Sequence, residues 1–245
     1  MTLLEAALLV VGGLCAGVIN TVAGGGSTLT VPLLVLAGVP GNAANGSNRI
    51  GVVVSNATAA TSFRRLGVDG FTHAVPVLVP VVAGSLLGSL AISRLTDDAF
   101  EMVFGLVMIP LIILSIRKPQ FRTDGARWSR TTTTIVFFGI GIYGGAIQAG
   151  VGLVLLAALT RAGFDLVVAN SMKVIVILVL TLTALPVFIA QGDIRWGPAL
   201  VLAAGFAAGG WLGAHAAVKG GERLIRAVMV LASIALAAKL LGAFG

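Results

Sequence analysis

Two polar clusters interrupt a strongly apolar sequence, and each combines glycines, side-chain amides and one basic residue. The members of the first cluster that could contact a ligand are Asn20, Thr21, Gly24, Gly25, Gly26, Ser27, Thr28, Asn45, Ser47, Asn48 and Arg49. Those of the second cluster are Gln148, Asn170, Ser171 and Lys173. Lipid tolerates such groups only where protein or a cavity surrounds them. We therefore predict that the two clusters line one solute site inside a membrane protein.

The two clusters share their internal spacing. Gly38 precedes Asn45 by the same number of residues as Gly163 precedes Asn170. In both copies an alanine comes directly before the asparagine, and a basic residue follows it within four positions. This correspondence predicts an internal repeat whose two copies meet at one pathway.

The run from Gly24 to Thr28 predicts a break between two helices. Three successive glycines disfavour a continuous helix, because each costs about 1 kcal/mol relative to alanine. Ser27 or Thr28 can cap a following short helix, whose N–H groups and partial positive charge would bind an anion. A purely structural role in tight helix crossing is the alternative. A nucleotide-binding loop is disfavoured, because the Gly-Lys-Ser/Thr sequence that such loops need is missing.

Arg49 and Lys173 predict the charge of the ligand. Neither has an obvious acidic partner in its own segment, and an unpaired cation inside a helix bundle favours an anionic ligand. Snorkelling toward the nearer membrane interface is the alternative, because both residues lie near the start of a segment. The neighbouring amides could serve helix association in place of a ligand.

Few residues could support catalysis. His73 and His215 are the two histidines, and each fits a capping or interfacial role better than proton transfer. Cys15 is the single cysteine, which excludes an intrachain disulfide and a multi-thiolate zinc site. The apolar segments contain neither a cluster of metal ligands nor a pair of carboxylates. We therefore predict a conduit without metal or cofactor, and not an enzyme.

The composition is that of an all-α polytopic membrane protein. Of the 245 residues, 58% are hydrophobic and 10% are charged, and the mean hydropathy is +1.06. A helix needs about 20 apolar residues to cross the bilayer, and several segments supply most of this length. The first segment lacks a basic region before it, so we interpret it as a membrane helix and not as a cleaved signal. The net charge of +7 lies mostly between segments, which disfavours nucleic-acid binding.

A basic region from Arg117 to Arg130 divides the chain almost in half. Its cations, proline and glycine predict a cytoplasmic linker over 119–129 between transmembrane repeats 1–118 and 130–245. Each repeat is predicted to have five segments: 4–22, 28–37, 43–65, 73–94 and 98–116 in the first, and 132–148, 152–161, 166–190, 197–217 and 222–242 in the second. Segments 28–37 and 152–161 are too short to cross the hydrocarbon, so we predict broken or re-entrant helices near the midplane.

Charges at the segment ends predict how the two repeats are oriented. Arg64 and Arg65 fit the cytoplasmic side, whereas Arg94 and the acidic residues that follow it fit the outside. Lys219 and Arg223 fit the cytoplasmic side again. These assignments agree if each half crosses the membrane an odd number of times, which makes the repeats inverted. Parallel repeats with an even number of crossings are the alternative.

In these motifs the chain resembles the TauE/SafE family of membrane transporters, which is grouped with the 4-toluene sulfonate uptake permeases. The resemblance rests on the run from Gly17 to Gly26, on Pro32 and Gly38, and on the sequence Ala44-Asn45-Gly46-Ser47-Asn48-Arg49. A second, more degenerate copy extends from Gly139 to Gly152 and includes Ala169-Asn170-Ser171. The resemblance covers essentially the whole chain.

This resemblance implies a secondary transporter of small sulfur-containing anions such as sulfite, sulfoacetate or other organosulfonates, with export favoured over uptake. It also implies the inner membrane of a bacterial or archaeal cell. The expected partners are the anion and the lipid bilayer, whereas a coupling ion such as a proton and a homo-oligomeric state stay open. Two other functions also stay open: a non-transporting membrane scaffold or assembly protein, and an anion channel.

Overall fold

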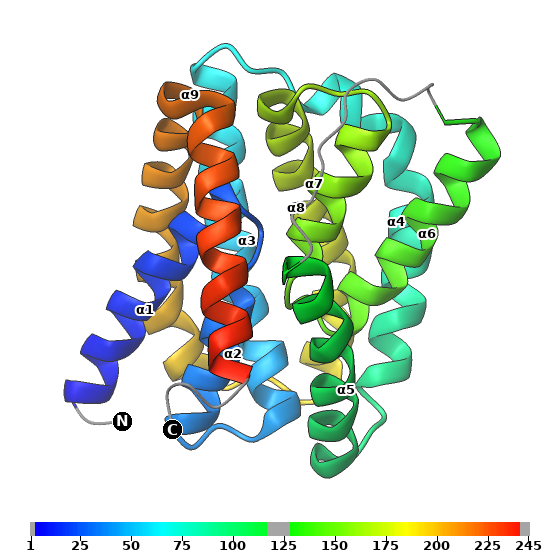
Figure 1. Ribbon diagram of the computed structural model, residues 1–245. Coiled ribbons are helices and arrows are strands. Elements are labelled where there is room, and N and C mark those ends of the chain that lie inside the picture. Colours follow the sequence, from blue (N-terminus) through cyan, green and yellow to red (C-terminus); the bar gives the residue numbers. More distant parts are fainter. Residues whose placement is uncertain (1–2, 117–127, 241–245) are drawn as a thin grey trace.

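The structure, a computed structural model, describes residues 3–116 and 128–240, and the regular elements in these ranges are all helices (Figure 1). The helices are α1 (Leu3–Val22), α2 (Ser27–Leu36), α3 (Gly41–Arg65), α4 (Phe71–Ile92), α5 (Asp97–Ile116), α6 (Arg130–Ala146), α7 (Val151–Arg161), α8 (Leu166–Ala190) and α9 (Trp196–Leu240). Most of the predicted linker 119–129 lies outside the described residues. The prediction of an all-α protein is confirmed.

Four helices in the described ranges are long and apolar enough to cross a membrane: Leu3–Val22, Phe71–Ile92, Leu166–Ala190 and Trp196–Gly221. They support the predicted polytopic membrane protein. The last of them ends at a break inside α9, where Gly221 has a φ of 55° and a ψ of −155°. Figure 1 shows the chain reversing there, so α9 is two helices. These two parts correspond to the predicted segments 197–217 and 222–242.

The short helices α2 and α7 cannot cross a bilayer. With 10 and 11 residues they extend about 15–17 Å, roughly half of the hydrocarbon thickness. In Figure 1, α1 and α2 have their outer ends at the lower side, whereas α6 and α7 have theirs at the upper side. The two breaks therefore lie inside the molecule, as the glycine-rich runs predict. The hairpin of α1 and α2 and the hairpin of α6 and α7 enter the molecule from opposite sides.

Glycines bring α1 against α9 and α4 against α6. A Cβ atom at Gly17 would lie 2.9 Å from the Cα atom of Gly209, and one at Gly141 would lie 3.1 Å from the Cα atom of Gly84. Such contacts let membrane helices approach through their backbones. The glycines lie four residues apart on each helix: Gly13 and Gly17, Gly205 and Gly209, Gly84 and Gly88, and Gly141 and Gly145.

The helices α3 and α8 lie at the centre, where they pack against each other. In addition, α3 packs against α9, and α8 packs against α4. The starts of both helices are polar yet buried, and they contain Asn45 to Arg49 in α3 and Asn170 to Lys173 in α8. In Figure 1, α3 runs upward and α8 runs downward, so the two polar stretches approach the centre from opposite sides.

Candidate functional site

The two helix breaks touch each other at the centre of the molecule. The backbone N–H of Gly152 donates a hydrogen bond to the carbonyl oxygen of Gly24 over 3.1 Å. A Cβ atom at Gly24 would lie 2.3 Å from the Cα atom of Gly152, and Gly24 has a φ of +87°, so both space and conformation require glycine there. The prediction that the two copies meet thus corresponds to a direct backbone contact.

Lys173 caps the end of α1. Its Nζ donates to the carbonyl oxygens of Asn20 and Thr21, at 2.9 Å and 2.7 Å, and the side chain is 0% exposed. The last carbonyls of a helix have no partner within the helix and carry a partial negative charge, which a cation stabilises. Lys173 comes from α8, so a residue of the second half completes the first helix of the first half.

Arg49 caps the end of α6 in the same way. Its Nη2 donates to the carbonyl oxygens of Gly145 and Ala146, at 2.6 Å and 3.0 Å, and its Nη1 donates to Gly144 at 3.3 Å. The guanidinium carbon lies 4.3 Å from the centre of the Phe188 ring. Arg49 is also 0% exposed, so neither cation snorkels to an interface.

In the structure, each cation therefore lies at the helix break of the other half of the chain. In the sequence, Arg49 follows the first glycine run and Lys173 follows the second. In space, Arg49 lies at the second break and Lys173 at the first. The missing acidic partners are replaced by helix-end carbonyls, and in the described residues no carboxylate is among the buried polar side chains.

Asn45 and Asn170 have matching places in the sequence but different surroundings. Asn45 donates from Nδ2 to the carbonyl oxygen of Ala146 over 2.8 Å. Asn170 is 0% exposed, and neither Nδ2 nor Oδ1 has a hydrogen-bond partner among the described residues. A buried amide without partners costs free energy, and among the described residues Asn170 is the buried amide side chain of which both polar atoms are unpaired.

Several other predicted site residues bond to the protein itself. Asn48 accepts from Thr30 Oγ1 at 2.5 Å and donates to Ser27 Oγ at 2.9 Å, which joins α2 to α3. Thr28 Oγ1 donates to the carbonyl oxygen of Gly25 over 2.6 Å. Ser171 Oγ donates to the carbonyl oxygen of Val68 over 3.4 Å, near the α3–α4 turn. These contacts position the helices around the breaks.

Free hydrogen-bonding groups remain at the first break. Within the described residues, the backbone N–H groups of Gly25, Gly26 and Ser27 donate to no backbone carbonyl. The Nδ2 atom of Asn20 and the Oγ1 atom of Thr21 are buried without a partner. A Cβ atom at Gly26 would lie 2.8 Å from the Cβ atom of Asn20, so this amide adjoins the start of α2. The first break therefore offers mostly donors.

The second break has fewer free groups. Gln148 donates from Nε2 to Thr181 Oγ1 over 2.5 Å, while its Oε1 is buried without a partner. Gln148 has a φ of 63°, and Gly150 at the start of α7 has a φ of 71°. Thr181 and Phe188 were not among the predicted site residues. A threonine and an aromatic ring within an apolar segment carry no sequence signal that distinguishes them from packing residues.

A loop closes the lower end of the first cluster. The backbone N–H of Arg195, between α8 and α9, donates to Ser47 Oγ over 2.8 Å. A Cβ atom at Gly46 would lie 1.9 Å from the carbonyl oxygen of Asp193, so the loop and α3 are in direct contact. Burial, with the charge of Asp97, raises the pKa of the Asp193 carboxyl. Ser47 thus anchors this loop over the site.

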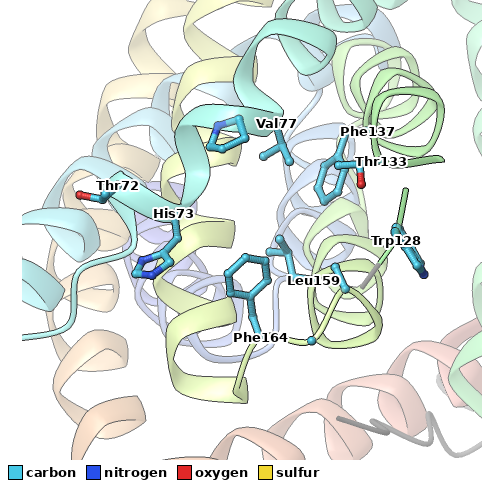
Figure 2. Close-up of a pocket in the computed structure, with 11 residues that line it drawn as sticks. Thr72, His73, Val77, Trp128, Thr133, Phe137, Leu159 and Phe164 are labelled. Carbon is cyan, nitrogen blue, oxygen red and sulfur yellow. The ribbon is translucent and has the colours of Figure 1, made fainter. Parts of the chain in front are cut away.

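A cavity of about 520 Å³ lies away from these residues, between the starts of α4 and α6 and the end of α7 (Figure 2). It is lined mainly by aromatic and aliphatic side chains, including His73, Trp128, Phe137, Leu159 and Phe164. None of the predicted site residues lines it. Among the described residues, no group of three His, Cys, Asp or Glu side chains could hold a metal ion.

Comparisons with known proteins identify the family of the chain. Residues 9–240 match the family model described as "Sulfite exporter TauE/SafE". The chain is 28% identical over 240 residues to the "Probable membrane transporter protein ORF9" of a Sinorhizobium species, covering 96% of this chain and 92% of the relative. It is 29% identical over 237 residues to a "Probable membrane transporter protein" of Haemophilus influenzae, covering 93% and 91%. It is 26% identical over 230 residues to the "Probable membrane transporter protein YfcA" of Escherichia coli K12, covering 92% and 86%. No solved structure matches the chain.

Proposed function

The chain belongs to the TauE/SafE family of membrane transporters, and we propose from this premise that it is a secondary transporter of small sulfur-containing anions. Sulfite, sulfoacetate and related organosulfonates are the proposed substrates, and export is the proposed direction. The observation that carries the proposal is the contact between the two breaks at Gly24 and Gly152, which we call the crossing. There Arg49 and Lys173 are buried beside unpaired donors, and no carboxylate side chain of the described residues is buried with them. Such groups in a membrane protein mark an anion path.

Alternating access is the proposed mechanism, with repeats 1–118 and 130–245 inverted about the crossing. The packing supports this symmetry, because exchanging the halves turns the α1–α9 contact into the α6–α4 contact. The same exchange turns the α3–α9 contact into the α8–α4 contact, and α2–α3 into α7–α8. In Figure 1 the corresponding helices run in opposite directions. Movement of one repeat against the other would then open the site to each side in turn.

The charge distribution supports a cytoplasmic position for the upper end of Figure 1, and with it the linker 119–129. The turn after α3, the end of α7 and the break in α9 lie at this end. They carry five cations, Arg64, Arg65, Arg161, Lys219 and Arg223, and three acidic residues, Asp69, Asp165 and Glu222. At the lower end the acidic residues Asp97, Asp98 and Asp193 outnumber the cations Arg94 and Arg195. This excess of cations at one end follows the positive-inside rule.

The sharpest test compares two asparagines at matching positions. Asn170→Ala removes an amide that has no partner among the described residues, so we expect equal or higher thermal stability and at least about tenfold weaker saturable sulfite flux in proteoliposomes. Asn45→Ala removes the hydrogen bond to Ala146 and should cost about 1 kcal/mol of stability. Normal flux and affinity in Asn170→Ala would contradict the assignment of Asn170 to the anion site.

The same proteoliposomes separate the other functions. A scaffold would show no saturable flux and no melting shift with any sulfur anion. An anion channel would show flux without counterflow, since a channel does not exchange one bound anion for another. Accelerated exchange of labelled sulfite against unlabelled sulfite supports the transporter.

A further inference from the structure

We propose that the crossing binds a ligand with two negative charges in preference to a ligand with one, an inference that rests on the proposed anion transport. Its basis is the balance of buried charge. In the described ranges, Arg49 and Lys173 are the charged side chains among the buried polar residues, and both are 0% exposed. The crossing therefore holds two buried basic side chains, and no carboxylate side chain is among the buried polar residues of the described ranges.

The helix ends do not change this balance. The ends of α1 and α6 each carry roughly half a negative charge, and the starts of α2 and α7 each carry roughly half a positive charge. These four ends lie beside the contact between Gly24 and Gly152, so their partial charges cancel. The capping bonds orient the two cations, but the net charge at the crossing stays that of the two side chains.

A ligand must offset this charge in a region that water reaches poorly. Two buried charges that lack counter-charges are costly, because desolvation is repaid only by close opposite charge. A doubly charged anion neutralises both cations, whereas a singly charged anion leaves one of them uncompensated. The binding free energy of the doubly charged ligand should therefore be more favourable than that of an analogue in which one acid group is neutral.

The unpaired hydrogen-bonding groups fit the same ligand class. The Arg49 Nε and Asn20 Nδ2 atoms are donors without acceptors. The Lys173 ammonium has a third N–H beyond the two it donates to α1. These donors are supplied by both cations and by the first break, which suits a ligand with oxygens at two ends. Sulfonates with a second acid group have this chemistry, whereas fully ionised sulfite carries its two charges on the oxygens of one sulfur atom.

Sulfoacetate and its methyl ester provide a matched test, because the ester keeps the sulfonate and removes the second charge. We expect sulfoacetate to compete with saturable sulfite uptake at a concentration at least about tenfold lower than the ester, given two close charges in a poorly solvated site. Equal competition by the two compounds in the wild-type protein would overturn the inference. Absence of saturable uptake of every sulfur anion would instead contradict the proposed function itself.

A charge-removing variant adds a second arm. In Lys173→Gln the crossing keeps one positive charge, so the preference for sulfoacetate over the ester should fall at least about tenfold. Lys173→Arg keeps the charge and should keep the preference. The ratio between the two ligands is measured within each protein, so a loss of folded material does not affect it. An unchanged ratio in a folded Lys173→Gln protein counts against the inference.

Discussion

Arg49 and Lys173 donate hydrogen bonds to the ends of helices, so replacing either residue should lower the free energy of unfolding. Each buried carbonyl that loses its donor costs about 1–3 kcal/mol. Arg49 serves three carbonyl oxygens at the end of α6, whereas Lys173 serves two at the end of α1. The same side chains that would attract an anion also hold the walls of its site together.

Arg49→Met should therefore lower the free energy of unfolding by about 2–5 kcal/mol. The measurement is the midpoint of thermal or denaturant unfolding in detergent. Arg49→Lys should recover part of the loss, because one ammonium can reach fewer carbonyls than the guanidinium. Arg64→Met is the control, since Arg64 is exposed at the end of the same helix. An equal loss in the two methionine variants would contradict the capping role of Arg49.

The residue types of this site could be predicted from the sequence, but their pairing could not. The spacing after Gly38 and Gly163 identifies the asparagines and the cations. Spacing along the chain does not reveal that Arg49 reaches residues 144–146 of the other half. The same limit applies to Asn45 and Asn170: both follow an alanine at the same spacing from a glycine, yet the Nδ2 atom of Asn45 is hydrogen-bonded and that of Asn170 is not.

At the scale of elements, the contact between the two breaks is the least tolerant part of the fold. The start of α7 lies directly on the turn between α1 and α2, because Gly152 bonds to Gly24. A side chain at either glycine would occupy the space of the other backbone. The α1–α2 and α6–α7 hairpins must therefore keep their present positions relative to each other if the site is to form.

Gly152→Ala should destabilise the protein by about 1–3 kcal/mol, because overpacking forces the two hairpins apart. Its Cβ would lie 2.3 Å from the Cα atom of Gly24. Gly139→Ala is the matched control within α6, since no atom of the described residues beyond its own helix turns lies within 4 Å of the added Cβ. That control should be neutral or slightly stabilising, because alanine favours a helix. Thermal melting of the two variants in one detergent checks the difference, and similar melting temperatures would count against the contact.

The positions of the helices could be predicted from the length of the hydrophobic segments and from the positions of glycines and charges. The segment predicted over 166–190 coincides with α8. The helices that each helix packs against could not be predicted from the sequence, although the glycine pairs on α1, α4, α6 and α9 are visible in it. Four similar glycine pairs could associate in several combinations, and their backbones alone do not distinguish one partner from another.

At the scale of the whole molecule, the proposed inversion sets where each loop must lie. Thr131 near the start of α6 and Gln191 in the turn after α8 are both exposed, and Figure 1 places their helix ends at opposite sides. The cation-rich upper end should face the cytoplasm. The two positions therefore report on opposite faces of the membrane.

Thr131→Cys and Gln191→Cys, each in a Cys15→Ser background, test this orientation in intact cells. A membrane-impermeant maleimide should label Gln191→Cys from outside and should label Thr131→Cys only after the cells are opened. Labelling both cysteines from outside would contradict the membrane crossing between the start of α6 and the end of α8, and labelling them in the reverse pattern would contradict the orientation.

The exchange of cations between the halves has a consequence for biosynthesis. After Asn20 is made, the ribosome must add 153 residues before Lys173 exists to complete the end of α1. During that time the nascent first half carries helix-end carbonyls that lipid cannot satisfy. A chain released before α8 would keep this defect, so the insertion machinery must shelter the early helices until the later ones arrive.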